Sequence, residues 1–153
     1  MDKIETKEPM IVHGKIILPY THSAGRVGSR FLRELRDSKR ILAIRCPACN
    51  RVYVPPRSTC ARCFGQLEEW VELDGRGTLI TYTVVRYPLP VHPVKAPFAL
   101  GIIQLDGADT GLIHMVGEAD LENLSIGTRL EPVFKEVREG SILDIKYFRP
   151  LAP

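Results

Sequence analysis

The pattern of apolar and polar positions changes twice along the 153-residue chain. Residues 1–25 mix prolines and glycines with short apolar pieces, which predicts an extended arm. In residues 26–40 the apolar side chains are spaced four, one and three positions apart, as on one face of a helix. They are Val27, Phe31, Leu32 and Leu35. We expect Ser29 to cap this helix, and Arg33 and Asp37 to form an i,i+4 ion pair.

Beyond residue 68 the sequence has five short runs rich in Ile, Val, Thr and Tyr, separated by turn residues, which predict β-strands. The runs are residues 77–87, 97–105, 110–117, 129–137 and 141–149. Residues 118–124 are expected to form one or two helical turns. Five strands with a short helix after the third is the element order of an OB-fold barrel. A generic five- or six-stranded barrel or sandwich is the alternative.

All four cysteines occur in two C-x-x-C units that are separated by ten residues. This spacing fits one tetrahedral Zn²⁺ bound by four thiolates, from Cys46, Cys49, Cys60 and Cys63. Four protein ligands leave no open coordination position, so the metal is expected to be structural rather than catalytic. Iron bound by the same thiolates is an alternative. Disulfides are disfavoured because the N-terminus lacks a secretory signal.

Together these elements predict a mainly β protein with an N-terminal helix, in which a rubredoxin-like zinc ribbon precedes a five-stranded OB-fold barrel. The expected divisions are 1–45 for the arm and basic helix, 46–66 for the ribbon and 67–153 for the barrel. The longest nearly apolar run, residues 97–105, is far shorter than the ~20 residues that span a bilayer. We therefore expect a cytoplasmic protein that does not contact membranes.

The formal net charge of +3 is the sum of a basic segment and an acidic segment that follow one another in the sequence. Residues 26–63 carry ten positive and two negative side chains, net +8, whereas residues 64–153 carry eight positive and thirteen negative, net −5. Such a separation of positive and negative charge indicates which kinds of partner a protein binds, and it does not indicate its fold. The basic face of the helix is expected either to be solvated or to contact an anionic partner surface or ligand. The residues for such a contact are Arg30, Arg33, Arg36 and Arg40.

No combination of residues forms a recognisable catalytic motif, so no catalytic residue is predicted. The four histidines, His13, His22, His92 and His114, are isolated from one another in sequence, and the cysteines are committed to the metal. The chain has no GxSxG, no phosphate-binding glycine loop and no HExxH. We expect an accessory protein rather than an independent enzyme.

A zinc ribbon joined to an OB-fold suggests a nucleic-acid-binding function as one alternative. That function requires stacking aromatics among basic residues on the second and third strands. Residues 98–105 and 110–117 contain one aromatic and no Lys or Arg, and the barrel segment is net negative. Phosphate repulsion works against binding there, although the basic helix and ribbon leave binding of single strands open.

The order of motifs resembles a family of zinc-ribbon/OB-fold proteins long known as a domain of unknown function and encoded beside thiolases. The matching features are the amphipathic helix before Cys46-Pro-Ala-Cys49, then Tyr53-Val-Pro-Pro-Arg57, Cys60-Ala-Arg-Cys63 and Trp70. They continue with GRGTLITYTV at residues 75–84 and APFALGIIQLD at residues 96–106. The resemblance covers residues 26–149 and leaves the N-terminal arm unmatched.

This resemblance implies a non-catalytic scaffold subunit of thiolase-superfamily enzymes, such as archaeal acetyl-CoA acetyltransferase with hydroxymethylglutaryl-CoA synthase. Other members of the family join a thiolase-like acyltransferase, an acyl-CoA hydratase or an aldolase. Coenzyme A is then contacted only within the complex. A small acyl-CoA-binding protein is a further alternative, and an isolated chain could cover its docking surface by forming a homodimer.

Overall fold

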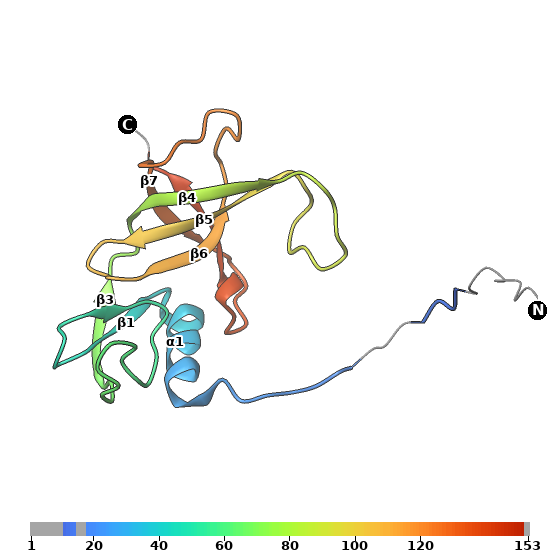
Figure 1. Cartoon of the computed structure of the whole chain (residues 1–153). Coiled ribbons are helices and arrows are strands. Elements are labelled where there is room, and N and C mark those ends of the chain that lie inside the picture. The colour runs from blue at the N-terminus through green and yellow to red at the C-terminus, as the bar shows by residue number, and fades with distance from the viewer. Residues whose placement is uncertain (1–10, 15–17, 152–153) are drawn as a thin grey trace, which may run out of the picture.

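The computed structural model describes residues 11–14 and 18–151 (Figure 1). It contains a helix, a three-stranded sheet and a closed five-stranded barrel, in that order along the chain. The described residues before the helix are exposed and form no helix or strand. The remainder of the predicted arm lies outside the described residues.

Helix α1 (Gly25–Ser38) forms where the apolar spacing predicted it and buries Phe31 and Leu35. The predicted Ser29 cap is wrong, because the N-cap is Ala24, five residues earlier, and makes no side-chain capping hydrogen bond. At the other end Lys39 adopts a left-handed conformation (φ 55°), and its N–H donates to the carbonyl oxygen of Glu34. The chain thereby turns directly into the sheet.

The three-stranded sheet has the order β2-β1-β3, and both of its pairings are antiparallel. Its strands are β1 (Ile41–Arg45), β2 (Val52–Tyr53) and β3 (Glu69–Leu73). The first four residues of β1 are all buried. A strand with such a continuous apolar run is covered on both faces. Here Ile41, Leu42 and Ala43 belong to the core shared with α1 and the barrel, and Ile44 belongs to the cluster beneath the cysteines.

The barrel has the strand order β4-β5-β6-β8-β7, with one strand at each run that the sequence predicted. Its strands are β4 (Gly77–Val85), β5 (Phe98–Leu105), β6 (Gly111–Val116), β7 (Arg129–Phe134) and β8 (Ile145–Pro150). Closure comes from a parallel contact between β6 and β8 at Val116 and Phe148, whereas the other pairings are antiparallel. This is the predicted OB-fold barrel.

The helical turns expected in residues 118–124 do not form, and a hydrogen-bonded turn replaces them. The carboxylate of Asp120 accepts from the N–H of Glu122 at 3.0 Å and from the side-chain amide of Asn123. Its carbonyl oxygen accepts from the N–H of Asn123 at 3.2 Å. Short polar side chains that bond nearby backbone groups compete with helix formation, which explains the difference.

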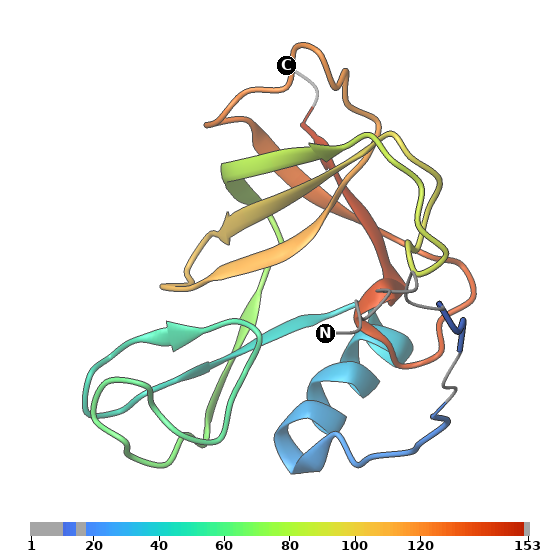
Figure 2. The same cartoon turned by 45° about the vertical axis from the view of Figure 1, so that its right-hand side comes forward.

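One hydrophobic core joins the two modules. It contains Phe31 and Leu35 of α1, residues of β1, and barrel residues such as Leu79, Ile103 and Phe148. A smaller cluster lies beneath the cysteines, and Trp70 packs against both clusters. Figure 2 shows α1 and the three-stranded sheet side by side beneath the barrel. In the part of the chain that the structure covers, no helix has the length and apolar character needed to cross a bilayer.

A buried carboxylate organises the turn before β8. Asp144, 2% exposed, accepts from the backbone N–H groups of Glu139, Gly140 and Ser141 at 3.0, 2.8 and 3.1 Å. Burial alone would raise the pKa of Asp144, but the three hydrogen bonds together outweigh burial and lower the pKa. Ionised Asp144 therefore stabilises the fold above the unfolded-state pKa, and this contribution is lost as the pH falls through the lowered value.

Asp144→Asn should lower the free energy of unfolding by about 1–3 kcal/mol at pH 7, because an amide cannot accept all three hydrogen bonds. The difference in the free energy of unfolding between the variant and the wild type should become smaller as the pH falls from about 4 through the lowered pKa of Asp144. Urea unfolding of both proteins across this range measures the effect. Glu136→Gln removes an exposed carboxylate and serves as the control. An unchanged free energy of unfolding for Asp144→Asn at pH 7 would contradict this account.

Candidate metal centre and basic cleft

The two C-x-x-C units have the same local backbone structure. In each, the residue after the second cysteine is left-handed (φ 53° at Asn50, 62° at Phe64) and donates its N–H to the carbonyl oxygen of the first cysteine, at 2.7 and 3.0 Å. The N–H of the first cysteine donates to a carbonyl oxygen two residues beyond each unit, Cys46 to Arg51 at 2.8 Å and Cys60 to Gly65 at 2.9 Å. Both loops therefore turn their two sulfurs toward one point.

The four sulfurs are positioned to bind one metal ion. The Sγ atoms of Cys46, Cys49, Cys60 and Cys63 all lie within 4.8 Å of one another, and those of Cys46 and Cys63 are 3.5 Å apart. A tetrahedron with metal–sulfur bonds of ~2.3 Å requires sulfur separations of about 3.8 Å, so the cluster fits such an ion. The cysteine prediction is thus supported by geometry, and the donor set is the one that structural zinc prefers.

Hydrogen bonds outside the cluster orient the sulfurs. The Tyr53 hydroxyl lies 3.2 Å from the Sγ atom of Cys60, and the N–H of Arg62 donates to the same sulfur at 3.4 Å. The N–H of Cys49 donates to the Sγ atom of Cys46, also at 3.4 Å. Donors of this kind stabilise thiolates and fix metal ligands in place.

The pKa values of two of the cysteines show that the thiols influence one another's ionisation. The hydrogen bond from Tyr53 lowers the pKa of Cys60 to about 5. The hydrogen bond with Cys63, followed by burial, raises the pKa of Cys49 to about 12. Four sulfurs so close together can all ionise only when a cation offsets their mutual repulsion.

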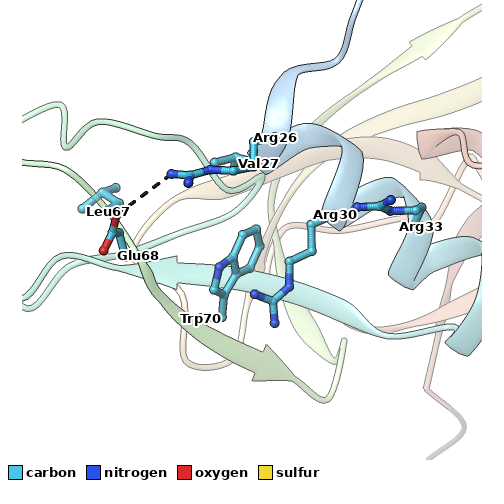
Figure 3. Close-up of a pocket in the computed structure, with 7 residues that line it drawn as sticks. All are labelled: Arg26, Val27, Arg30, Arg33, Leu67, Glu68 and Trp70. Atoms are coloured by element: carbon cyan, nitrogen blue, oxygen red, sulfur yellow. Dashed lines mark ion pairs between the residues drawn. The ribbon is translucent and has the colours of Figure 1, made fainter.

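The second feature is a cleft of about 350 Å³ between α1 and β3, shown in Figure 3. The guanidinium of Arg30 lies over the ring of Trp70, with its central carbon 4.4 Å from the ring centre. The lining residues are Arg26, Val27, Arg30, Arg33, Leu67, Glu68 and Trp70. A guanidinium stacked on an aromatic ring, with further arginines lining the same cleft, is suited to bind an anionic group.

The structure separates the four arginines of the predicted contact. Arg30 and Arg33 line the cleft. Arg36 is bound to Asp37, Nε to Oδ1 at 2.7 Å, and Arg40 is bound to Glu34, Nη2 to Oε2 at 2.7 Å. The predicted pair of Arg33 with Asp37 is absent from the ion pairs of the described residues, because Arg36 occupies that carboxylate. Arg33 is thereby left available in the cleft.

Sequence reasoning missed Arg26 and Trp70 as parts of this cleft. Arg26 approaches Glu68, Nη2 to Oε1, at 4.0 Å (Figure 3). Trp70 is far from the helix in sequence and reaches it only because β3 pairs with β1. The sequence did offer one signal for the cleft, the single tryptophan of the chain, which follows the cysteine units.

His114 has a packing role. It is buried, its Nε2 lies 3.2 Å from the carbonyl oxygen of Ile142, and its Nδ1 accepts from the N–H of Met115 at 2.9 Å. Burial lowers the pKa of His114. His92 lies edge-on to Phe98 in the loop before β5. These two histidines therefore lie in separate packing environments.

Two family models match consecutive parts of the chain. The rubredoxin-like zinc ribbon domain of ChsH2 matches residues 33–68, and the C-terminal OB-fold domain of ChsH2 matches residues 70–135. Together they cover the second half of α1, the cysteine units and most of the barrel. The ribbon and the barrel thus both correspond to known modules in this order.

Among similar proteins are scaffold proteins that contain a DUF35 domain. That of Methanocaldococcus jannaschii is 29% identical over 111 residues, 72% of this chain and 78% of the relative. That of Pyrococcus furiosus is 28% identical over 127 residues, 80% of this chain and 92% of the relative. A probable enoyl-CoA hydratase alpha subunit of Thermomonospora curvata is 27% identical over 124 residues, and only 37% of that protein is covered.

Two solved structures share the fold. An Ltp2-ChsH2(DUF35) aldolase matches with a TM-score of 0.65 and 22% identity, over 85% of this chain and 98% of the matched chain. A DUF35 protein of unknown function from Sulfolobus solfataricus matches with a TM-score of 0.61 and 22% identity, over 82% and 84%. At this identity the likeness concerns the architecture alone.

Replacing one ligand should release the metal. We expect one metal ion per wild-type chain and none retained in Cys49→Ser, with a lower unfolding temperature, because three sulfurs cannot complete the tetrahedron. Native mass spectrometry and elemental analysis measure both the stoichiometry and the element. Ala48→Ser, on the exposed tip of the same unit, is the matched control. Full metal content in Cys49→Ser would refute this assignment.

Tyr53→Phe tests the orienting hydrogen bond. Loss of the hydroxyl that bonds the sulfur of Cys60 should weaken metal affinity about 10- to 100-fold while preserving the fold, as for other partners of metal ligands. Competition with a chromophoric chelator measures the affinity. An affinity equal to that of the wild type would show that this hydrogen bond does not support the centre.

Proposed function

We propose that this chain, which belongs to the family of ChsH2-type zinc-ribbon and OB-fold proteins, is a non-catalytic scaffold subunit of an acyl-CoA enzyme complex. The enzyme on which it docks is a thiolase-like one: acetyl-CoA acetyltransferase, hydroxymethylglutaryl-CoA synthase or a related enzyme. The observation that carries the proposal is the match to DUF35 scaffold proteins over 72–80% of this chain. The hydratase subunit of Thermomonospora curvata supports the link to acyl-CoA chemistry.

In this function the metal centre is a structural Zn²⁺ site with Cys46, Cys49, Cys60 and Cys63 as ligands. The cluster of buried residues beneath the cysteines is small, and modules of this size need a metal to hold their fold. A bound Zn²⁺ would hold the two cysteine loops against β1. It would thereby also hold the residues of the basic cleft that follow the second loop. The site has no further role in the proposal.

The basic cleft is the contact that the structure favours for an anionic group of the complex. Arg30 and Arg33 are free of carboxylate partners among the described residues, and Trp70 offers an aromatic face beside them. Such a group is a carboxylate of the partner enzyme or a phosphate of the coenzyme A that the enzyme holds. Arg36 and Arg40 already neutralise carboxylates of this chain and are expected to contribute little.

The first test is purification of the tagged chain from its native cells, with mass spectrometry of the bound proteins. A thiolase-like enzyme should be enriched, and its acyl-transfer activity should fall when this chain is removed. If the enriched proteins include no acyl-CoA enzyme, the proposed function fails.

The double variant Arg30→Ala/Arg33→Ala should lower the amount of co-purified enzyme at least tenfold, and the remaining binding should depend less on salt. Arg36→Ala/Arg40→Ala, at the end of α1 and just beyond it, is the matched control and should retain most of the binding. Thermal unfolding of both variants checks that the fold is intact. Equal retention by the two double variants would exclude the cleft as the contact site.

A further inference from the structure

The loop between β4 and β5, residues 86–97, exposes an unusual amount of apolar surface. Figure 1 shows this loop extending away from the barrel. Its exposed side chains are Tyr87 (62%), Leu89 (46%), Val91 (84%) and Val94 (42%). Scattered apolar residues are normal on a surface, but four of them within eight residues form a patch of the kind that marks an interaction site.

The loop is held in one conformation by its own contacts. The N–H of His92 donates to the carbonyl oxygen of Leu89 at 3.1 Å, and the N–H of Leu89 donates to Nδ1 of His92 at 3.3 Å. The ring of His92 packs edge-on against Phe98, with centroids 5.2 Å apart. Four prolines, Pro88, Pro90, Pro93 and Pro97, restrict the backbone further. A preordered loop loses little conformational entropy when it binds.

An apolar slot of about 350 Å³ lies where this loop meets the barrel. Its walls include Val94, Phe98, Met115, Leu121 and Tyr147. Gly117 is required here, because a Cβ atom at this position would lie 2.5 Å from Cγ of Tyr147. The Tyr147 hydroxyl donates to Glu118, which has a left-handed backbone (φ 51°). The wall thus includes one non-glycine residue, Glu118, in a backbone conformation that such residues rarely adopt.

The charged groups around the slot give the loop surface a positive sign. Lys95 and Lys146 both line the slot, and neither takes part in an ion pair of the described residues. Glu118 is satisfied by Tyr147 and by Arg149, whose Nη1 lies 3.4 Å from Oε2. A complementary partner surface is therefore apolar with carboxylates at its edge.

We propose that loop 86–97 and the adjoining slot form a docking surface for the partner enzyme subunit, through an apolar segment flanked by carboxylates. This inference rests on the proposed scaffold function. A small ligand in the slot would leave the outward side chains of Leu89 and Val91 unexplained, whereas a protein surface covers both the slot and the loop. Aromatic and aliphatic side chains on a rigid element are typical binding hot spots.

The position of this surface suits a scaffold. Figures 1 and 2 both place loop 86–97 and the tip of the zinc ribbon on opposite sides of the molecule. The basic cleft lies between α1 and β3 beside the ribbon, so the apolar loop and the cleft are separate surfaces. A chain that binds through both can hold two subunits, or two parts of one enzyme, at a fixed separation.

Val91→Asp tests the loop without touching the fold, because this side chain is 84% exposed. We expect at least a tenfold loss of co-purified enzyme, since a charge would be buried in an apolar contact. Val137→Asp, at a side chain that is 78% exposed in another loop, is the matched control and should retain full binding. Equal binding by Val91→Asp and the wild type would overturn the proposal.

A photo-reactive p-benzoylphenylalanine at position 91, in the full chain in its native cells, identifies what covers the loop. Crosslinks to an acyl-CoA enzyme, absent from the same probe at position 137, would support the proposal. Crosslinks only to a second copy of this chain, or none, would overturn it. If purification of the wild-type chain yields an acyl-CoA enzyme but the probe at position 91 forms no crosslink to it, the docking role of loop 86–97 is refuted. The proposed scaffold function then still stands. If no such enzyme is found at all, the scaffold function itself fails.

Discussion

Burial of strand β1 on both faces is the constraint on which the rest of the structure depends. Ile41, Leu42 and Ala43 contribute to the core that α1 shares with the barrel, whereas Ile44 belongs to the cluster beneath the cysteines. A strand between two cores cannot shift without exposing both. The cysteine loop that begins at Cys46, the helix that ends before Ile41 and the barrel are therefore held in one arrangement.

This arrangement is reinforced at the junction of ribbon and barrel by hydrogen bonds. The carboxylate of Asp109 accepts from the N–H of Val52 at 2.8 Å, and the hydroxyl of Thr110 donates to the carbonyl oxygen of Val54 at 2.9 Å. Both residues lie at the turn between β5 and β6, far from β2 in sequence. Ribbon and barrel are therefore joined by hydrogen bonds as well as by the shared hydrophobic core.

Charge is distributed unevenly over this body because most arginines of the acidic half are neutralised locally. Arg129 is bound to Asp106, and Arg149 is bound to Glu118 and Glu131. Near the ribbon, by contrast, Arg30 is held over an aromatic ring and Arg33 has no carboxylate partner among the described residues. Exposed ion pairs stabilise little, so their main effect here is to neutralise these arginines while Arg30 and Arg33 stay without a carboxylate partner in the described part of the chain.

The sequence by itself determined the local features, because their information is local. The spacing of Phe31 and Leu35 placed the helix, runs rich in Ile, Val, Thr and Tyr between turn residues placed five strands, and the cysteine spacing placed a four-sulfur cluster. The pattern did not reveal the local hydrogen bonds of Asp120, nor that the helix starts five residues earlier than a cap at Ser29 indicated. The choice of Arg36 rather than Arg33 as the partner of Asp37 is a local contact that the spacing did not indicate. Only the tertiary structure decided that Trp70 lies against Arg30, because the pairing of β3 with β1 brings the two together. It also decided that the apolar residues of loop 86–97 stay outside the core, since burial depends on contacts between segments far apart in the chain.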